Sequence, residues 1–129
     1  YQMAEGYARR SLALRVNRNG KTYLTLATAL VASHRFAEAE QVAREAVERR
    51  LAACVNLLPP MTSVYRWHGE VTRQEEHLLL FKTRADRFAA LRDLLLEIHP
   101  YDIPEVIAIP IETGSDGYLK WLDDSLAPS

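Results

Sequence analysis

The sequence contains a single cysteine, Cys54, among its 129 residues. One thiol cannot form an internal disulfide, and it cannot supply the four cysteine ligands of a structural zinc site. This scarcity favours a reduced, cytoplasmic setting, where disulfides are rare. We expect Cys54 to be a packed core residue, because free cysteine is among the most buried residue types and no base that could activate it lies nearby in the sequence.

The net charge is small, glycine is infrequent and long apolar runs are absent from the sequence. The formal net charge is −1, which argues against a nucleic-acid partner, because such proteins carry a clustered basic excess. The five glycines are not grouped into a phosphate-binding loop. No apolar run approaches the roughly 18 residues that cross a bilayer, so we expect no membrane partner. No spacing indicates a catalytic triad or a pair of catalytic carboxylates, and we therefore expect a protein that is not an enzyme.

The first twenty residues differ in charge from the rest of the chain. They hold four arginines against Glu5, a charge of +3, so residues 21–129 carry −4. We treat residues 1–20 as an N-terminal arm of unassigned role and residues 21–129 as one domain, which is the usual number for a chain of this length. The apolar fraction of 48% is sufficient for a hydrophobic core.

Hydrophobic periodicity predicts strands and helices in alternation. Strand patterns cover residues 21–32, 52–70, 75–84 and 105–111, with an interruption at Pro59-Pro60 that indicates an edge or a bulge. Apolar residues at three- and four-residue spacing predict amphipathic helices over residues 36–51 and 86–98. A short C-terminal helix is predicted over residues 115–126, with Tyr118, Leu119 and Leu122 facing inward.

This order of elements predicts an α+β, ferredoxin-like (split βαβ) fold. Its antiparallel sheet carries both long helices on one face. Leu78 and Leu80 point to one face of the sheet, and Leu79 and Phe81 point to the other, so the strand is apolar on both sides. Since the helices cover one face, we expect further copies of the chain to cover the other in a homo-oligomer.

Five segments together resemble the CutA family, also called divalent-cation-tolerance proteins. They are LAACVN, SVYRWHGE, EEHLLLFKTR, HPYDIPEVIAIPI and YLKWL, and the resemblance runs from about Leu24 to Leu126. It implies a small cytoplasmic protein that forms a homotrimer with the PII-like architecture, in agreement with the bare sheet face. It also implies a link to copper and other divalent cations. The alternative function is that of a PII-like small-molecule sensor or signalling scaffold.

The resemblance also implies candidate metal ligands, although the chain departs from the family pattern. The matching position of a first-strand cysteine that several members use for copper is Ala27, and the common hairpin tip WEGK reads WHGE here. Glu76 and His99 remain as the implied ligands for weakly bound Cu²⁺ or Zn²⁺, which accept carboxylate and imidazole. Two ligands do not make a tight site, so a third would come from a neighbouring subunit or from water.

Each candidate ligand also has a simpler interpretation. His99 stands before Pro100 and can simply end the second helix. Glu76 can be a solvated strand residue. His77 follows Glu76 in the same strand, so the two side chains face opposite ways, and we expect His77 to be solvated.

Aromatic residues are the candidates for contacts between subunits, because aromatic side chains dominate interface cores. We expect Trp67 and Trp121 to be interface anchors. Tyr65 shares a strand face with Trp67 at period two, and together with Tyr101 it is a candidate for lining a ligand cleft between subunits. For Tyr101 the alternative is simple packing on the strand that follows.

Overall fold

The computed structural model describes residues 21–31, 36–98 and 103–128 of the chain. The elements in these residues are β1 (Tyr23–Val31), α2 (Phe36–Glu48), β2 (Cys54–Leu57), β3 (Met61–Trp67), β4 (Glu70–Arg84), the short 3-10 helix η1 (Ala85–Arg87), α3 (Phe88–Ile98), β5 (Ile107–Pro110) and α4 (Asp116–Leu126). The predicted order of strands and helices is confirmed. The predicted arm, residues 1–20, lies outside the described residues, so the division into arm and domain stays a prediction.

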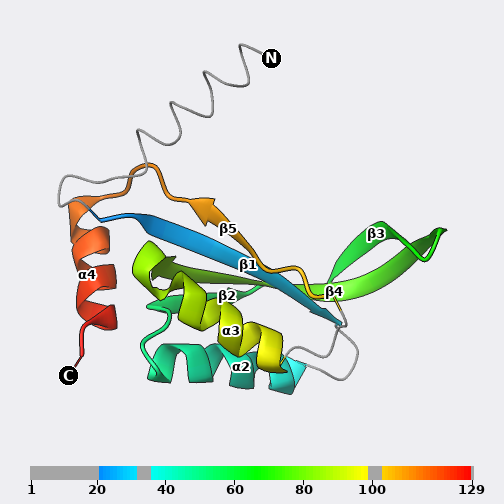
Figure 1. Ribbon diagram of the computed structural model, residues 1–129, viewed down its shortest axis with the longest axis horizontal. Coiled ribbons are helices and arrows are strands. Elements are labelled where there is room, and N and C mark those ends of the chain that lie inside the picture. The colour runs from blue at the N-terminus through cyan, green and yellow to red at the C-terminus, as the bar shows by residue number, and fades with distance from the viewer. Residues whose placement is uncertain (1–20, 32–35, 99–102, 129) are drawn as a thin grey trace, which may run out of the picture.

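The strands form one antiparallel sheet in the order β2–β4–β1–β5, and β3 pairs with the other half of the long strand β4. Helices α2 and α3 lie against one face of this sheet, and α4 stands across one of its ends (Figure 1). This arrangement confirms the predicted α+β, ferredoxin-like fold. The trimer is a property of several chains and stays a prediction.

The interruption predicted at Pro59-Pro60 is a bulge that separates β2 from β3. Leu57 pairs with Leu79 and Met61 pairs with Glu76, so residues 58–60 stand opposite residues 77–78. The extra residue bends the strand and increases its twist. Beyond the bulge, β3 and the first half of β4 leave the body of the domain as a projecting hairpin (Figure 1).

The hairpin closes through the two residues His68 and Gly69. Their φ angles are 50° and 81°, and two positive φ angles in a two-residue loop are typical of a type I′ turn. This turn suits the right-handed twist of the paired strands, and glycine at the second position adopts it without steric cost.

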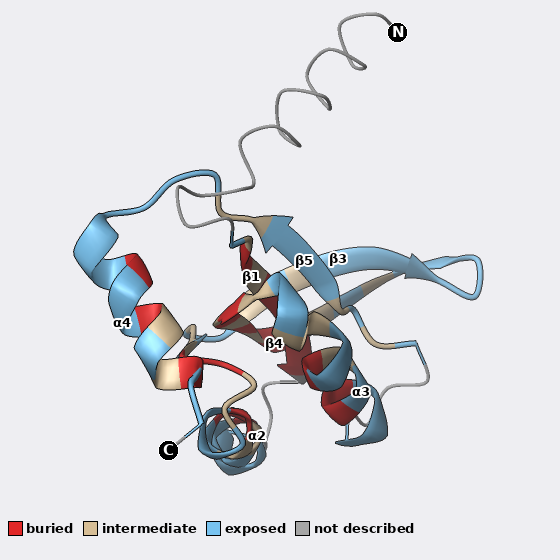
Figure 2. Ribbon diagram, turned by 60° about the vertical axis from the view of Figure 1, so that its left-hand side comes forward, coloured by how far each residue is buried: buried red, intermediate tan, exposed pale blue. Residues whose placement is uncertain are grey.

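The buried apolar residues form two separate clusters (Figure 2). The main core lies between the sheet and α2 and α3, and its members are Leu26, Leu30, Ala39, Ala46, Ala52, Leu79, Phe81, Leu91, Leu94 and Leu95. The smaller cluster joins α4 to the end of the sheet through Tyr23, Ala53, Leu119, Leu122 and Leu126. The inward orientation predicted for Leu119 and Leu122 is confirmed. The same prediction for Tyr118 was wrong, since its side chain is exposed at the flank of α4.

The sheet face opposite α2 and α3, here called the open face, is largely apolar. Leu79 belongs to the main core, so its neighbours Leu78 and Leu80 point to the open face, where they are half-buried. On β5, Ile107 pairs with Ala27 and is 48% exposed, and Ile109 is 51% exposed. The prediction that the strand carrying Leu78 to Phe81 is apolar on both faces is therefore confirmed, and the exposed isoleucines of β5 extend the apolar surface of the open face.

Candidate functional site

Glu76 lies on the open face at the point where β4 leaves the body of the domain. It pairs with Val31 of β1 and with Met61 of β3. Its side chain is only 7% exposed, so the interpretation of Glu76 as a solvated strand residue was wrong. Carboxylates are seldom buried to this extent without charged or hydrogen-bonding neighbours, because leaving water is costly for a charge. The burial of the Glu76 carboxylate therefore indicates that this part of the sheet provides such neighbours.

Tyr65 and Trp67 continue the line of Glu76 along the hairpin. Residues that stand directly opposite each other in an antiparallel pair share a face. Met61 pairs with Glu76, and Tyr65 and Trp67 follow Met61 at even spacing, so all three candidates lie on the open-face side. The side chains of Tyr65 and Trp67 are 37% and 40% exposed. Their predicted common face is confirmed, while their roles in a ligand cleft and an interface stay predictions.

Local contacts hold these two aromatic rings. The Tyr65 hydroxyl donates to Oε1 of Gln74 over 2.7 Å. The Trp67 ring packs edge-on against the His68 ring, with centroids 4.8 Å apart. The hairpin therefore presents partly exposed aromatic rings in fixed orientations.

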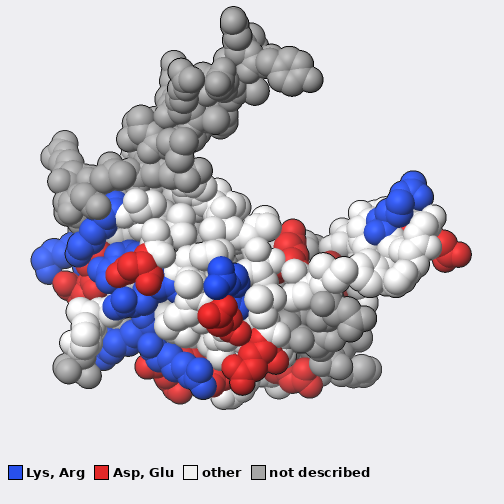
Figure 3. All heavy atoms as spheres, in the orientation of Figure 1, with Lys and Arg blue, Asp and Glu red and all other residues white. Residues whose placement is uncertain are grey.

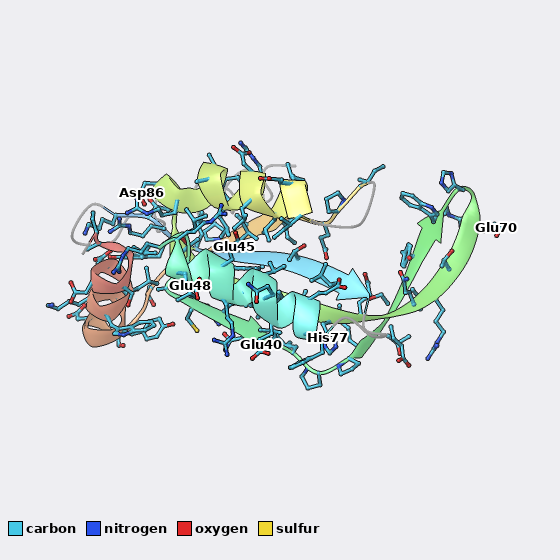
Figure 4. The ribbon with its side chains drawn as sticks, turned by 90° about the horizontal axis from the view of Figure 1, so that it is seen from below. Glu40, Glu45, Glu48, Glu70, His77 and Asp86 are labelled. Carbon is cyan, nitrogen blue, oxygen red and sulfur yellow. The ribbon has the colours of Figure 1, made fainter. Side chains whose placement is uncertain are left out.

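His77 points to the opposite face from Glu76 and is buried, with 5% of its surface exposed. The prediction of a solvated His77 was wrong, and the bulge explains why. The Leu58 carbonyl lies at the bulge, 2.9 Å from Nδ1 of His77, which donates to it because a carbonyl only accepts. The ring also packs edge-on against Phe36 at the first turn of α2, with centroids 5.5 Å apart. Figure 4 shows His77 beside the start of α2. As predicted, Glu76 and His77 face away from each other.

The other candidates are only partly placed. His99 and Tyr101 lie outside the described residues, so their relation to Glu76 stays a prediction. Trp121 is 46% exposed on α4 and packs against Tyr118, with ring centroids 5.4 Å apart. Cys54 is half-buried on β2 and pairs with Lys82, so it is less enclosed than the expected core residue.

The described residues of one chain do not complete a metal site. Within residues 21–31, 36–98 and 103–128, no three side chains of His, Cys, Asp or Glu lie close enough to hold an ion. Of the two predicted ligands this region contains Glu76 alone. A metal centred on Glu76 therefore requires ligands from elsewhere in the chain, from a second copy or from water.

A polar cluster around Asp123 of α4 was not predicted from the sequence. The Tyr23 hydroxyl donates to Oδ2 over 2.7 Å, Nη1 of Arg84 donates to Oδ1 over 3.1 Å, and Nζ of Lys21 lies 3.4 Å from Oδ2. Burial opposes ionisation of the Asp123 carboxyl, but the hydrogen bonds from Tyr23, Arg84 and Lys21 outweigh it and lower its pKa. These partners lie 100, 39 and 102 positions away, so no local pattern could have revealed the cluster.

These features define a class of protein. It is a ferredoxin-like domain that has a long projecting hairpin, one bare apolar face and a buried acidic residue on that face. Within this class, residues 27–125 match the model of the family described as CutA1 divalent ion tolerance protein. The match covers most of the chain, and the chain belongs to this family.

Relatives and solved structures agree with this assignment. A CutA homolog from Xenopus laevis is 44% identical over 100 residues, which are 78% of this chain and 66% of that protein. The divalent-cation tolerance protein CutA of Thermus thermophilus is 47% identical over 87 residues, 67% of this chain and 84% of that protein. The periplasmic divalent cation tolerance protein CutA of Archaeoglobus fulgidus superposes with a TM-score of 0.77 at 33% identity, covering 82% of this chain and all of that one.

The chain spans about half to two thirds of the length of the vertebrate relatives that it matches. None of the helices in the described part of the chain is both long and apolar enough to cross a membrane.

Proposed function

We propose that the chain is a homotrimeric divalent-cation tolerance protein that binds Cu²⁺ or Zn²⁺ weakly at clefts between subunits and catalyses no reaction. The observation that carries this proposal is the buried Glu76 carboxylate on the open face, in line with the partly exposed rings of Tyr65 and Trp67. Carboxylate oxygen is a ligand that divalent cations accept. The family description and the names of the relatives, which refer to divalent ions, agree with the proposal.

The open face supports the assembly part of the proposal. Ile107 and Ile109 of β5 are about half exposed, and Leu78 and Leu80 of β4 are half-buried. Strand β1 lies between them, with Ala27 in register with both Ile107 and Leu80. Contiguous apolar surface on a folded domain marks an interaction site, and a second copy of the same chain would cover it. Trp67 and Trp121, on the hairpin and on α4, are the proposed aromatic anchors of that contact.

The assembly also explains how one buried acid could become a binding site. A single carboxylate holds a divalent ion poorly, since stable protein sites use three or four ligands. We propose that His99 and groups from a neighbouring copy complete the site, with water in any remaining position. Because an imidazole must be neutral to bind a metal, binding should weaken in acid.

Calorimetric titration of Cu²⁺ and Zn²⁺ tests this proposal. The native protein is compared with Glu76→Gln, with His99→Ala and with the control Glu75→Gln. Glu75 is the exposed neighbour of Glu76 and points to the other face of the hairpin. We expect Glu76→Gln and His99→Ala to weaken binding at least about tenfold, because each removes one of few ligands. Native-like binding by Glu76→Gln, with the trimer intact by light scattering, would remove Glu76 from the site.

The second candidate is a PII-like small-molecule sensor whose cleft is lined by Tyr65 and Tyr101. It is favoured by the hydroxyl–amide pair of Tyr65 and Gln74, which offers polar groups on the hairpin next to the apolar part of the open face. Such a sensor would be stabilised against heat by one organic ligand, which a thermal-shift screen detects.

For the cellular compartment of this protein we propose the cytoplasm, which cell fractionation tests. The relative from Archaeoglobus fulgidus is named periplasmic.

A further inference from the structure

Helix α4 packs in a small cluster of its own. Leu119, Leu122 and Leu126 contact Tyr23 and Ala53, with Ile111 at the margin, and none of these residues belongs to the main core. An element that shares no buried residue with the main core can open locally at a free-energy cost below that of global unfolding. The packing of α4 is therefore separable from the folding of the sheet with α2 and α3.

Charged and polar groups fasten α4 to the sheet at its third turn. Asp123 receives the Tyr23 hydroxyl on one carboxylate oxygen and Nη1 of Arg84 on the other. The side chains of Asp123 and Arg84 are each 13% exposed, so water screens this pair much less than a surface pair. Lys21 adds a longer ion pair of 3.4 Å to the same carboxylate.

Two arginines fasten the C-terminal end of the same helix. Nη1 of Arg50 donates to the Ser125 carbonyl over 3.1 Å, and Nη2 of Arg87 donates to the Leu126 carbonyl over 2.9 Å. Cations at this end of a helix are favourable, because the last carbonyls carry partial negative charge. Figure 3 shows Lys and Arg side chains gathered at the end of the molecule where α4 lies, with acidic side chains among them.

Arg50 makes its contact from a strained backbone. Its φ angle is 59°, in the left-handed region where glycine is the usual residue after a helix. The carbonyl of Arg50 in turn accepts a hydrogen bond from Nε of Arg87 over 3.2 Å. The end of α2, the 3-10 helix η1 and the end of α4 are thus joined by side-chain hydrogen bonds from two arginines, without residues of the main core.

We propose that α4, here called the strap, undocks from the end of the sheet as one unit while the sheet, α2 and α3 stay folded. Asp123 sets the fraction of molecules in which the strap is docked. Undocking uncovers Tyr23, Ala53 and Ile111 and so enlarges the apolar surface next to the open face. The strap therefore controls how much apolar surface this end of the sheet exposes, and this control does not depend on cation binding.

Hydrogen–deuterium exchange of the native full chain, followed by mass spectrometry of its peptides, tests the strap. The variant Asp123→Asn is compared with Asp124→Asn, a control on the next residue of the same helix. Asp124 is exposed and its ion pair, to Lys120, stays within α4. In Asp123→Asn we expect amides of residues 116–126 to exchange roughly tenfold faster or more, since hydrogen bonds to charged groups are worth at least that factor. Peptides from α2 and β4 should keep their native rates, and Asp124→Asn should match the native protein throughout.

A milder variant keeps the test decisive if Asp123→Asn unfolds as a whole. Tyr23→Phe removes one donor to Asp123 and leaves the volume of the buried ring almost unchanged, so it should accelerate exchange in α4 to a smaller degree. Native exchange rates in α4 of Asp123→Asn would overturn the proposal. So would acceleration of α2, β4 and α4 by one common factor in both variants, because α4 would then open only with the whole domain.

Discussion

Thr28 and Thr83 face the same covered side of the sheet but differ in their hydrogen bonds. Both side chains are completely buried. The Thr83 hydroxyl donates to the Leu51 carbonyl over 2.7 Å, whereas the Thr28 hydroxyl has no partner among the described residues. We expect Thr28→Val to raise the free energy of unfolding by about 1 kcal/mol, because it removes an unsatisfied polar group.

The matched variant is Thr83→Val, which should lower the free energy of unfolding by about 1–2 kcal/mol because it leaves the Leu51 carbonyl unpaired. Urea denaturation of the two variants at one protein concentration measures both effects. Equal destabilisation by the two substitutions would show that the Thr28 hydroxyl does find a partner.

The Asp123 carboxylate predicts how the stability of the fold changes with pH. Its pKa is lowered in the folded chain, so the ionised carboxylate stabilises the fold at all pH values above its ordinary pKa of about 4. That contribution is lost as the pH falls from about 4 through the lower folded value, since both states then bind the proton. The melting temperatures of the native protein and Asp123→Asn should differ at pH 7, and the difference should shrink as the pH falls below the ordinary carboxyl pKa. A difference in melting temperature that does not shrink in acid would contradict this assignment.

At the scale of elements, the β3–β4 hairpin depends on its two-residue turn. Asn-Gly is the preferred pair for a type I′ turn, because asparagine tolerates a positive φ angle better than histidine does. We expect His68→Asn to raise the free energy of unfolding by roughly 0.5 kcal/mol and Gly69→Ala to lower it by about 1 kcal/mol. Thermal denaturation measures both changes. A loss of stability in His68→Asn would show that contact with the Trp67 ring outweighs the backbone preference.

The sequence predicted elements whose signals are local. The period of the apolar residues located the helices and strands, and the two prolines located the bulge between β2 and β3. Period two also placed Tyr65 and Trp67 on one face. The burial of His77 could not be predicted, because it depends on the Leu58 carbonyl at the bulge and on Phe36 at the start of another element.

The candidate site was predicted less completely than the fold. Glu76 was selected through the family resemblance, but its burial follows from the junction of three strands, which strand patterns alone do not specify. The Asp123 cluster joins β1, β4 and α4, so only the folded chain brings its members together.

At the scale of the whole molecule, substitutions at two neighbouring leucines of β4 test folding and assembly independently. Leu79 is fully buried under the helices, whereas Leu80 is half-buried on the open face. Leu79→Glu should unfold the chain, because an unpaired charge in the core is very costly. Leu80→Glu should leave a folded chain of lower assembly mass. Circular dichroism and light scattering distinguish the two results, and a Leu80→Glu variant with native mass would exclude this part of the open face from the interface.

The central claim is that copies of this chain cover the open face, since the proposed cation site requires groups from more than one subunit. Light scattering of the native chain at micromolar concentration tests it most directly. The account predicts a mass three times that of the 14.7 kDa chain, retained after dilution. A mass of one chain would contradict it, because the apolar face and the buried Glu76 would then belong to a monomer.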